Sequence, residues 1–270
     1  MVKSVEQDSR GIIDPASGLT AFRLTRHAAS GGLERFVDRY WIATWDLPPG
    51  TEHTQSVLVH PVVNIVFDAG GTVSGVQERT FTRTLAGSGR VLGIMFRPAG
   101  FRPFWERPAR ELTNRALPLT TVLGPDAGAL QAALDAAEDE EAMVEAAERL
   151  LRPHVPDDQH PGEATTALVE RVASDRGIRR VDQVAELAGV GVRTLQRRFA
   201  DHVGVSPKWV IRRYRLYDAA EAAARGQDVA WADLADQLGY SDQAHLTRDF
   251  TAAIGMPPER YSRHCAQSTA

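Results

Sequence analysis

Short apolar runs separated by turn residues occupy residues 36 to 104, which is the pattern of β-strands. The runs are RYWIATWDL, QSVLVH, VVNIVFDAG and RVLGIMFRP, with GTVSG and a polar, hairpin-like stretch before the last. Pro48-Pro49-Gly50, Gly70-Gly71 and Gly87-Ser88-Gly89 stand where strands should reverse, because glycine supplies a positive φ and proline fixes φ at about −65°. This pattern predicts a small β-sandwich or barrel.

The pattern changes to helix after Leu112. DAGALQAALDAA and EEAMVEAAERLL place apolar residues three and four apart and are rich in Ala and Glu, so we expect two helices that flank the strands. RPHVPDDQHPGE is rich in proline and has one apolar residue, Val155, which is typical of a linker. The chain is therefore predicted to be a two-domain α+β protein. Its predicted parts are a β-rich domain with flanking helices over residues 1–151, a linker over 152–163 and an all-α domain over 164–264.

The all-α part contains an internal repeat whose copies lie about 50 residues apart. The matched pairs are Ala185 and Ala235, Gly189 and Gly239, Leu195 and Leu246, Arg197 and Arg248, Phe199 and Phe250, Gly204 and Gly255, and Pro207 and Pro258. The alanine lets two helices approach closely, and the first glycine permits the tight turn of a helix-turn-helix. We therefore predict two helix-turn-helix units in tandem.

The second helix of each unit has an apolar and a polar face. Leu195 and Phe199 are four residues apart and point into the core, whereas Arg197 lies about 200° round the helix from Leu195 and points outward. Arg193 and Gln196 flank the same outward side. Such a face can enter a major groove of DNA, where Arg suits guanine and Gln suits adenine.

A further helix is predicted to connect the two units. Ser206 is a good N-cap and Pro207 a good first residue, and the helical pattern continues to about Arg225. Because this helix makes the separation of the units rigid, the two outward faces could occupy successive major grooves, roughly 34 Å apart. One chain could then read an extended site.

The net charge of −4 conceals an uneven distribution of charge. Residues 190 to 215 contain a single acidic residue, Asp201, among seven basic ones. The basic residues are Arg193, Arg197, Arg198, Lys208, Arg212, Arg213 and Arg215. Residues 228 to 263, beginning at Asp228, carry more acidic than basic side chains. We therefore expect the first unit to anchor the phosphates and the second to add sequence discrimination.

The second unit resembles the AraC/XylS family of transcription regulators. The segment DLADQLGYSDQAHLTRDFTAAIGMPPERYSR carries that family's signature from Gly239 to Tyr261, and the first unit agrees through LAGVGVRTLQRRF and GVSPKWVIRRYRL. Gly191 stands where family members commonly have Ser, which weakens the N-cap of the first recognition helix. The front of the chain is similar to cupin-like sensor domains through RYWIATWDLPPG, VHPVVNIVFDAG and GIMFRPAGFRPFW.

The resemblance implies a sequence-specific regulator that binds double-stranded DNA and has a cupin-like β-barrel in front. Its base-reading residues would be Arg193, Thr194, Gln196, Arg197, Gln243, Ala244, His245 and Arg248, with phosphate contacts from Arg198, Lys208 and Arg212. A small-molecule effector, RNA polymerase and a second copy of the chain are the further candidate partners. The alternative is a DNA-bound scaffold whose front domain only dimerises or recruits polymerase.

The front part offers few residues with an obvious chemical role. His53 and His60 are seven residues apart without a carboxylate in register, so we predict no metal site and no cofactor. Arg97 and Arg102 fit either an anionic ligand or surface loops. The aromatic side chains could line an effector pocket, although such residues are more often plain core. They are Trp41, Trp45, Phe67, Phe96, Phe101, Phe104 and Trp105.

The composition, with 43% hydrophobic and 24% charged residues, is that of a folded globular chain. No stretch approaches the roughly 18 apolar residues of a membrane span, and the first thirty residues lack the apolar middle of a signal peptide. We therefore expect a cytoplasmic protein. The only cysteine, Cys265, lies in the polar tail RHCAQSTA, where we expect an exposed thiol. The absence of a nucleophile elbow, phosphate loop or zinc motif disfavours an enzyme with a DNA-targeting module.

Overall fold

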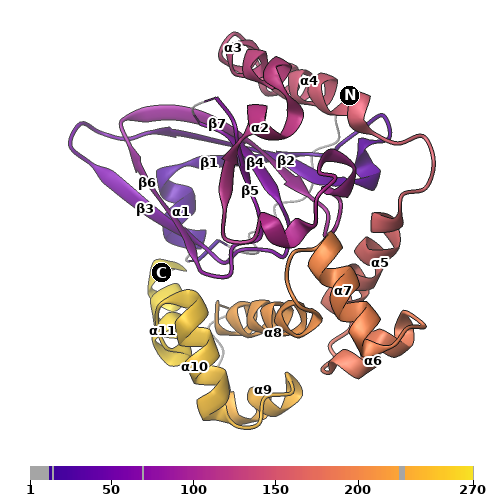
Figure 1. Cartoon of the computed structure of the whole chain (residues 1–270). Helices are drawn as coiled ribbons and strands as arrows, with labels where there is room; N and C mark the ends of the chain where they lie inside the picture. The colour runs from indigo at the N-terminus through magenta and orange to yellow at the C-terminus, as the bar shows by residue number, and fades with distance from the viewer. Residues whose placement is uncertain (1–11, 14, 69, 225–228, 270) are drawn as a thin grey trace.

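A computed structural model describes residues 12–13, 15–68, 70–224 and 229–269. Strands occupy the front part of the chain, and the last hundred residues are helical (Figure 1). The chain is thus a mixed α and β protein with an N-terminal sheet and a C-terminal helical part, as the sequence predicts. Arg225 and Asp228, which entered the predictions of helix and charge, lie outside the described residues.

The main sheet has six antiparallel strands in the order β1-β2-β7-β4-β5-β8. These are β1 (Arg23–His27), β2 (Val37–Asp46), β4 (Asn64–Phe67), β5 (Thr72–Ser74), β7 (Ser88–Phe96) and β8 (Ala116–Pro118). The strands β3 (Glu52–Val57) and β6 (Phe81–Ala86) form a separate two-stranded sheet.

The cupin-like barrel is not confirmed. A barrel requires hydrogen-bonded pairing round the whole circumference, but the edge strands β1 and β8 do not pair with each other within the described part of the chain. The sheet is therefore open. The strands β5 and β8 are only three residues long, and helices cover one face of the sheet instead.

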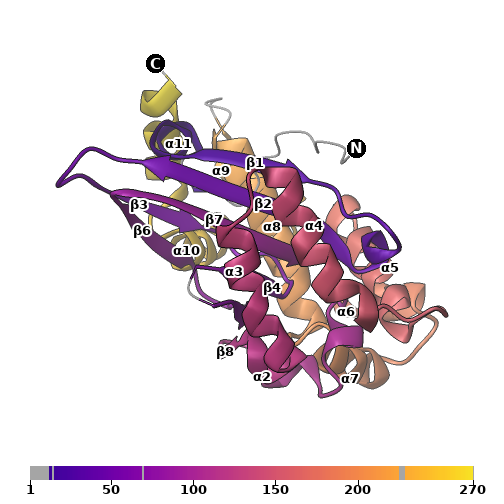
Figure 2. The ribbon, with the colours of Figure 1, turned by 90° about the horizontal axis from the view of Figure 1, so that it is seen from above.

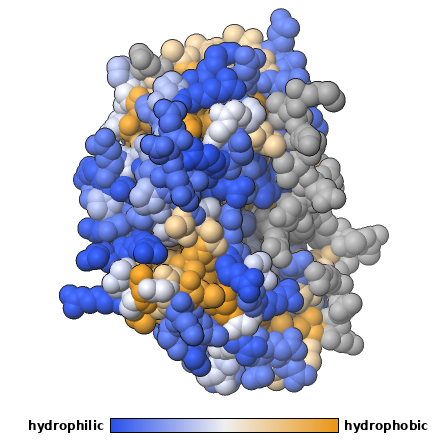
Figure 3. Space-filling view, turned by 90° about the vertical axis from the view of Figure 1, so that its right-hand side faces the viewer, coloured by the Kyte–Doolittle hydropathy of each residue, from blue (hydrophilic) through white to orange (hydrophobic). Residues whose placement is uncertain are grey.

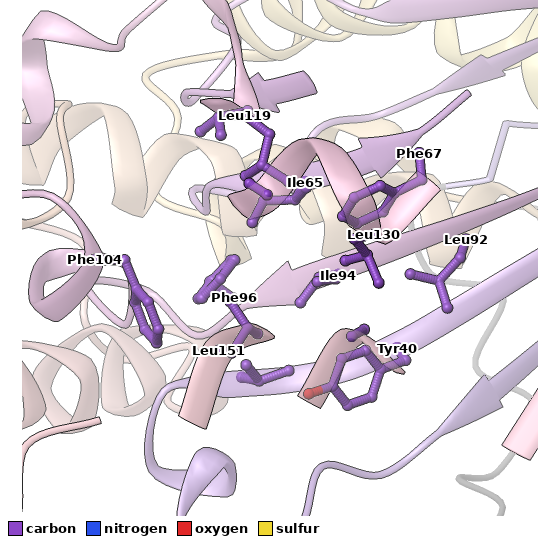
Figure 4. Packing of buried hydrophobic residues seen from close by; sticks show 14 of the residues in the cluster. Tyr40, Ile65, Phe67, Leu92, Ile94, Phe96, Phe104, Leu119, Leu130 and Leu151 are labelled. Carbon is purple, nitrogen blue, oxygen red and sulfur yellow. The ribbon is translucent and has the colours of Figure 1, made fainter. Parts of the chain in front are cut away.

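These helices confirm the prediction that two helical segments flank the strands. The predicted segments correspond to α3 (Ala129–Asp135) and α4 (Glu140–Leu151), and a further short helix, α2 (Leu119–Leu123), precedes them; all three lie across one face of the sheet (Figure 2). Side chains such as Tyr40, Ile94 and Phe96 point from the sheet toward Leu130 and Leu151 of the helices (Figure 4). All five are buried in one apolar core, so the hydrophobic effect holds α3 and α4 on the sheet.

The opposite face of the sheet carries two tryptophans of β2. Trp41 pairs with Gly93, and Trp45 pairs with Gly89, across the β2–β7 ladder. A Cβ atom at Gly93 would lie 2.0 Å from the Trp41 ring, and one at Gly89 would lie 2.3 Å from the Trp45 ring. Glycine therefore leaves the space that each indole occupies over β7.

The helical part has two apolar cores, one for each half of the repeat. Its helices are α5 (Pro161–Ser174), α6 (Val181–Leu187), α7 (Val192–His202), α8 (Pro207–Ala224), α9 (Trp231–Gln237), α10 (Gln243–Ile254) and α11 (Pro258–Thr269). Helix α8 contributes Val210 and Ile211 to the first core and Leu216 and Ala219 to the second. It lies between the two halves (Figure 1), as predicted for the connecting helix.

Two local predictions need revision. Cys265 is buried, not exposed, because α11 continues through the tail and turns Cys265 toward the core on the same face as Tyr261, four residues earlier. The predicted linker is partly helical, since α5 begins at Pro161.

No helix of the described part is long and apolar enough to cross a membrane.

Candidate nucleic-acid interface

The first unit of the repeat consists of α6 and α7. Gly189 has a φ of 62° between the two helices, and Val190 N donates to Ala185 O at 3.1 Å to close the turn. Leu195 and Phe199 are completely buried and anchor α7 in the first core. These are the roles that the repeat predicts for the glycine and the two apolar residues.

The outward face of α7 is polar and exposed. Arg193, Thr194, Gln196 and Arg197 all have exposed side chains, so the structure brings the four predicted base-reading residues of this unit together on one helix. Figure 3 shows the side of the molecule on which α5 to α7 lie, where hydrophilic side chains surround an apolar patch in the lower half of the view. At the start of α7, Gly191 provides no side-chain cap, as expected from its lack of a side chain.

The second unit consists of α9 and α10 and repeats the same turn. Gly239 has a φ of 77°, and Tyr240 N donates to Ala235 O at 2.9 Å. Unlike α7, α10 has a true N-cap, because the Asp242 carboxylate accepts a hydrogen bond from His245 N at 2.7 Å. This backbone hydrogen bond lowers the pKa of Asp242.

The predicted base-reading residues of α10 differ in their surroundings. Gln243, Ala244 and Arg248 are exposed. His245 is only partly exposed, because its Nδ1 lies 3.2 Å from the Ser241 hydroxyl and its ring packs edge-on against Tyr240. His245 is therefore held in place by neighbours, whereas the other three face solvent.

The predicted phosphate contacts also differ. Lys208 is exposed and Arg198 is half-buried. Arg212 is exposed at the surface but donates from Nε to the Asp249 carboxylate at 2.8 Å. This pair joins α8 to α10. Asp249 was not singled out in the sequence, although it lies four residues after His245 on the same face of the helix.

Residues 190 to 215 expose fewer basic side chains than the sequence predicts, because two of the seven, Arg213 and Arg215, are buried. Arg215 donates to the Val172 carbonyl at 2.6 Å and to the Asp218 carboxylate at 2.8 Å. Arg213 donates to the Glu78 carbonyl at 2.8 Å. Burial lowers the pKa of both guanidinium groups. They hold the helices and the front part together and are removed from the surface that could meet phosphates.

The two histidines considered as metal ligands, His53 and His60, have partners within the chain. His53 lies 3.3 Å from the Gln55 side-chain oxygen, and the ring of His60 stacks on Tyr217 at 4.5 Å. Among the described residues, no group of three or more His, Cys, Asp or Glu side chains could hold a metal ion.

The two arginines of the FRPAGFRPFW segment hold loops. Arg97 donates to the Glu34 carbonyl at 2.8 Å and to Glu170 at 2.5 Å, and Arg102 donates to the Trp105 carbonyl at 2.6 Å. Five of the seven predicted pocket aromatics are buried in the core, and only Trp41 and Trp45 are half-buried. Five of these aromatic residues are therefore part of the apolar core, which is the more usual role of such side chains.

Comparison with known families agrees with this geometry. Residues 184–264 match the family described as a helix-turn-helix domain, and residues 25–118 match a domain of unknown function (DUF6597). The chain thus carries a helix-turn-helix domain behind a separate N-terminal domain. That helix-turn-helix domain is similar to those of AraC-like regulators.

The relatives that share the helix-turn-helix domain are named as regulators. The chain is 33% identical over 84 residues to an AraC-like transcription regulator of Streptomyces lividans, and 29% identical over 98 residues to an HTH-type transcriptional regulator of Haemophilus influenzae. The matches cover 31% and 36% of this chain and 27% and 33% of the relatives. The chain therefore matches about a third or less of the length of each relative.

Solved structures give weaker likenesses. The C-terminal domain of AraT, a response regulator from Geobacillus stearothermophilus, is 21% identical, with 39% of this chain and 86% of that chain covered and a TM-score of 0.35. ToxT from Vibrio cholerae is 11% identical, with 90% and 98% covered and a TM-score of 0.40.

Proposed function

We propose that this chain is a sequence-specific transcription regulator that reads two successive major grooves with α7 and α10. One observation carries the proposal. Both second helices bury a leucine and a phenylalanine four residues apart and expose a polar face, and both pack on the same helix, α8. The AraC-type domain and the names of its relatives support the same function.

The residues take different roles in this proposal. On α7, Arg193, Thr194, Gln196 and Arg197 read base edges, because Arg and Gln form paired hydrogen bonds with guanine and adenine. On α10, Gln243, Ala244, His245 and Arg248 do the same in the next groove. Arg198 and Lys208 bind phosphates and fix the register of the chain on the duplex. Arg212 is a third candidate contact, and it can reach a phosphate only in competition with its partner Asp249.

The test begins with selection of duplexes from a randomised DNA library by the full-length protein. Fluorescence titrations at fixed salt then compare a selected duplex with a scrambled one, and we expect a preference of at least about 10³-fold. Arg197→Ala should lose most of this binding. Arg149→Ala is the matched control, because Arg149 is an exposed arginine on α4 of the front part. No enrichment of any duplex, or equal losses for the two variants, would contradict the proposal.

We further propose that the front domain senses a small-molecule effector. The half-buried indoles of Trp41 and Trp45 offer a flat apolar surface on the sheet face opposite α3 and α4. The face of the sheet that α3 and α4 cover is less suitable for binding an effector. A cavity of about 250 Å³ there is smaller than the roughly 300–1,000 Å³ of typical ligand pockets. Its lining residues are Phe67, Arg90, Leu92, Gln131, Leu134, Asp135 and Met143.

A thermal-shift screen against small metabolites tests the sensor, because a ligand that binds only the folded state raises the melting temperature. A compound that binds at the indoles should stabilise the wild type more than Trp41→Leu. If no compound stabilises the protein, the scaffold alternative is favoured, in which the front domain dimerises or recruits RNA polymerase. Sedimentation of the full chain with and without DNA then measures dimerisation.

A further inference from the structure

The front domain contacts the first helix-turn-helix unit at the end of its recognition helix. Thr113 Oγ1 donates to the carbonyl of Gly204, immediately beyond α7, at 2.7 Å. Arg110 forms an ion pair with Asp201 in the last turn of α7. A Cβ atom at Gly204 would lie 3.0 Å from the Ala109 carbonyl, so the glycine permits this close approach. Residues 109–113 therefore hold one end of α7.

A second loop of the front domain contacts the other half of the repeat. The Glu78 carbonyl accepts a hydrogen bond from Arg213 of α8 at 2.8 Å. Thr80 Oγ1 donates to the carbonyl of Ala253 in the last turn of α10. Residues 78–80 therefore hold α8 and the end of the second recognition helix.

These two loops are joined to each other by Glu78 and Asn114. The Glu78 N–H donates to Asn114 Oδ1 at 2.9 Å, and Asn114 Nδ2 donates to the Glu78 carboxylate at 2.7 Å. The Asn114 N–H donates to the Val76 carbonyl at 2.9 Å. The backbone of Asn114 has a φ of 58°, a left-handed conformation that asparagine tolerates better than most residues. The pair continues the β5–β8 ladder, whose last partners are Ser74 and Ala116.

We propose that the Glu78–Asn114 pair positions the two recognition helices at a fixed separation and so sets the spacing of the DNA half-sites that the protein accepts. The inference rests on the proposed function. Helix α8 joins the two units directly, and the paired loops join them a second time through the front domain. A connection at both places leaves the units less freedom to rearrange on DNA whose half-sites are wrongly spaced.

Three variants of the full chain test the pair. Asn114→Asp tolerates the left-handed backbone but places a carboxylate against that of Glu78, so the pair should separate. Glu78→Gln keeps a side-chain oxygen that accepts from Asn114 and should behave as the wild type. The double variant, Glu78→Gln with Asn114→Asp, places a glutamine amide N–H opposite the new carboxylate and should restore the hydrogen bond between the two side chains. Arg115→Ala is the control one residue away, because its side chain donates to the Glu111 carbonyl in its own loop.

The first measurement is the distance between the recognition helices without DNA. Spin labels at Thr194→Cys and Ala244→Cys, in a Cys265→Ala background, report the separation of α7 and α10 by pulsed electron spin resonance. We expect a narrow distribution for the wild type, Glu78→Gln and the double variant, and a broad one for Asn114→Asp. The same distribution in all four proteins would overturn the inference, whether or not the protein binds DNA.

The second measurement uses the duplex selected by the wild type and a version with one base pair inserted between its halves. The insertion moves one half-site by about 3.4 Å and rotates it by about 35°. We expect it to weaken wild-type binding by roughly tenfold or more, comparable to a mismatched base pair, and to weaken Asn114→Asp by less than about threefold. If no duplex is selected, the proposed function fails. If the wild type binds and the spacing penalty is equal in both proteins, the inference fails.

Discussion

Asp249 in α10 accepts a hydrogen bond from Nε of Arg212 in α8 at 2.8 Å. The side chain of Asp249 is mostly buried, whereas that of Arg212 is 45% exposed. The guanidinium therefore lies at the surface, where it could reach a phosphate, but it is neutralised by a carboxylate of the second recognition helix. A phosphate that binds Arg212 must compete with Asp249.

This competition predicts that Asp249→Asn binds DNA more tightly and with a stronger dependence on salt. Release of one arginine adds about one phosphate contact, which steepens the plot of log affinity against log salt by about 0.9. Titrations at several salt concentrations measure the slope. The double variant Asp249→Asn with Arg212→Ala is the control and should return the slope to the wild-type value. An unchanged slope in Asp249→Asn would show that Arg212 does not reach the backbone.

Arg197 and Arg248 occupy equivalent positions in the repeat but should have unequal effects. Both are exposed, so alanine at either position should leave the melting temperature unchanged. We expect Arg197→Ala to lose at least about tenfold in affinity, and Arg248→Ala mainly to reduce the preference for the selected duplex over mismatched ones. Binding titrations at one salt concentration compare them, and equal losses would refute the division of roles.

The cap of the first recognition helix can be improved. Gly191 has the extended backbone of an N-cap, and no atom lies within 4 Å of the place where its Cβ would be. Gly191→Ser should therefore fit and raise the free energy of unfolding by about 0.3 kcal/mol. Asp242→Ala removes the equivalent cap of α10 and should lower it. Urea denaturation measures both. A lower stability in Gly191→Ser would mean that the hydroxyl does not reach the backbone of α7.

Stability should fall in mild acid because of His202. Burial, with Arg102 and Arg198 nearby, lowers the pKa of His202 to about 4, whereas an unfolded histidine has a pKa of about 6.5. The unfolded chain therefore takes up the proton first, and the contribution of His202 is lost as the pH falls from about 6.5 to about 4. His202→Asn does not titrate and keeps a polar partner for Thr165, which lies 2.8 Å from the imidazole.

Urea denaturation between pH 4 and 7 is expected to give a shallower decline for His202→Asn than for the wild type. His160 has a lowered pKa for the same reason, burial, so part of the decline should remain. His264→Asn changes an exposed histidine and serves as the control. Parallel curves for His202→Asn and the wild type would contradict the assignment.

The sequence predicted the elements whose pattern is local. The strands β2, β4 and β7 lie in the apolar-rich runs RYWIATWDL, VVNIVFDAG and RVLGIMFRP, and the helices α7, α8 and α10 have periodic apolar residues, so each was expected close to its observed position. By contrast, β6 was expected only as a polar, hairpin-like stretch, because most of its side chains are exposed. The short edge strand β8 was not expected. Whether a sheet closes depends on contacts between distant strands, which periodicity does not contain.

The candidate interface, like the fold, was predictable only where it depends on local sequence pattern. The repeat indicated which side of α7 faces outward, because Leu195 and Phe199 mark the buried side. It did not indicate that Arg213 and Arg215 are buried. Helix α8 packs against both units and the front domain, so burial reaches positions that are polar in the sequence. The hydrogen bonds that accommodate them come from carbonyl groups far away in the chain, such as that of Glu78.

Because Trp41 packs closely over Gly93, we expect the residues at these two positions to covary among related sequences. A side chain at position 93 would overlap the indole ring, so neither residue can enlarge or shrink independently without a clash or a gap. Among related sequences, residues larger than glycine at position 93 should occur only where position 41 has lost its tryptophan. The pair is thus a marker, visible in sequence alone, for relatives that keep this surface of the sheet.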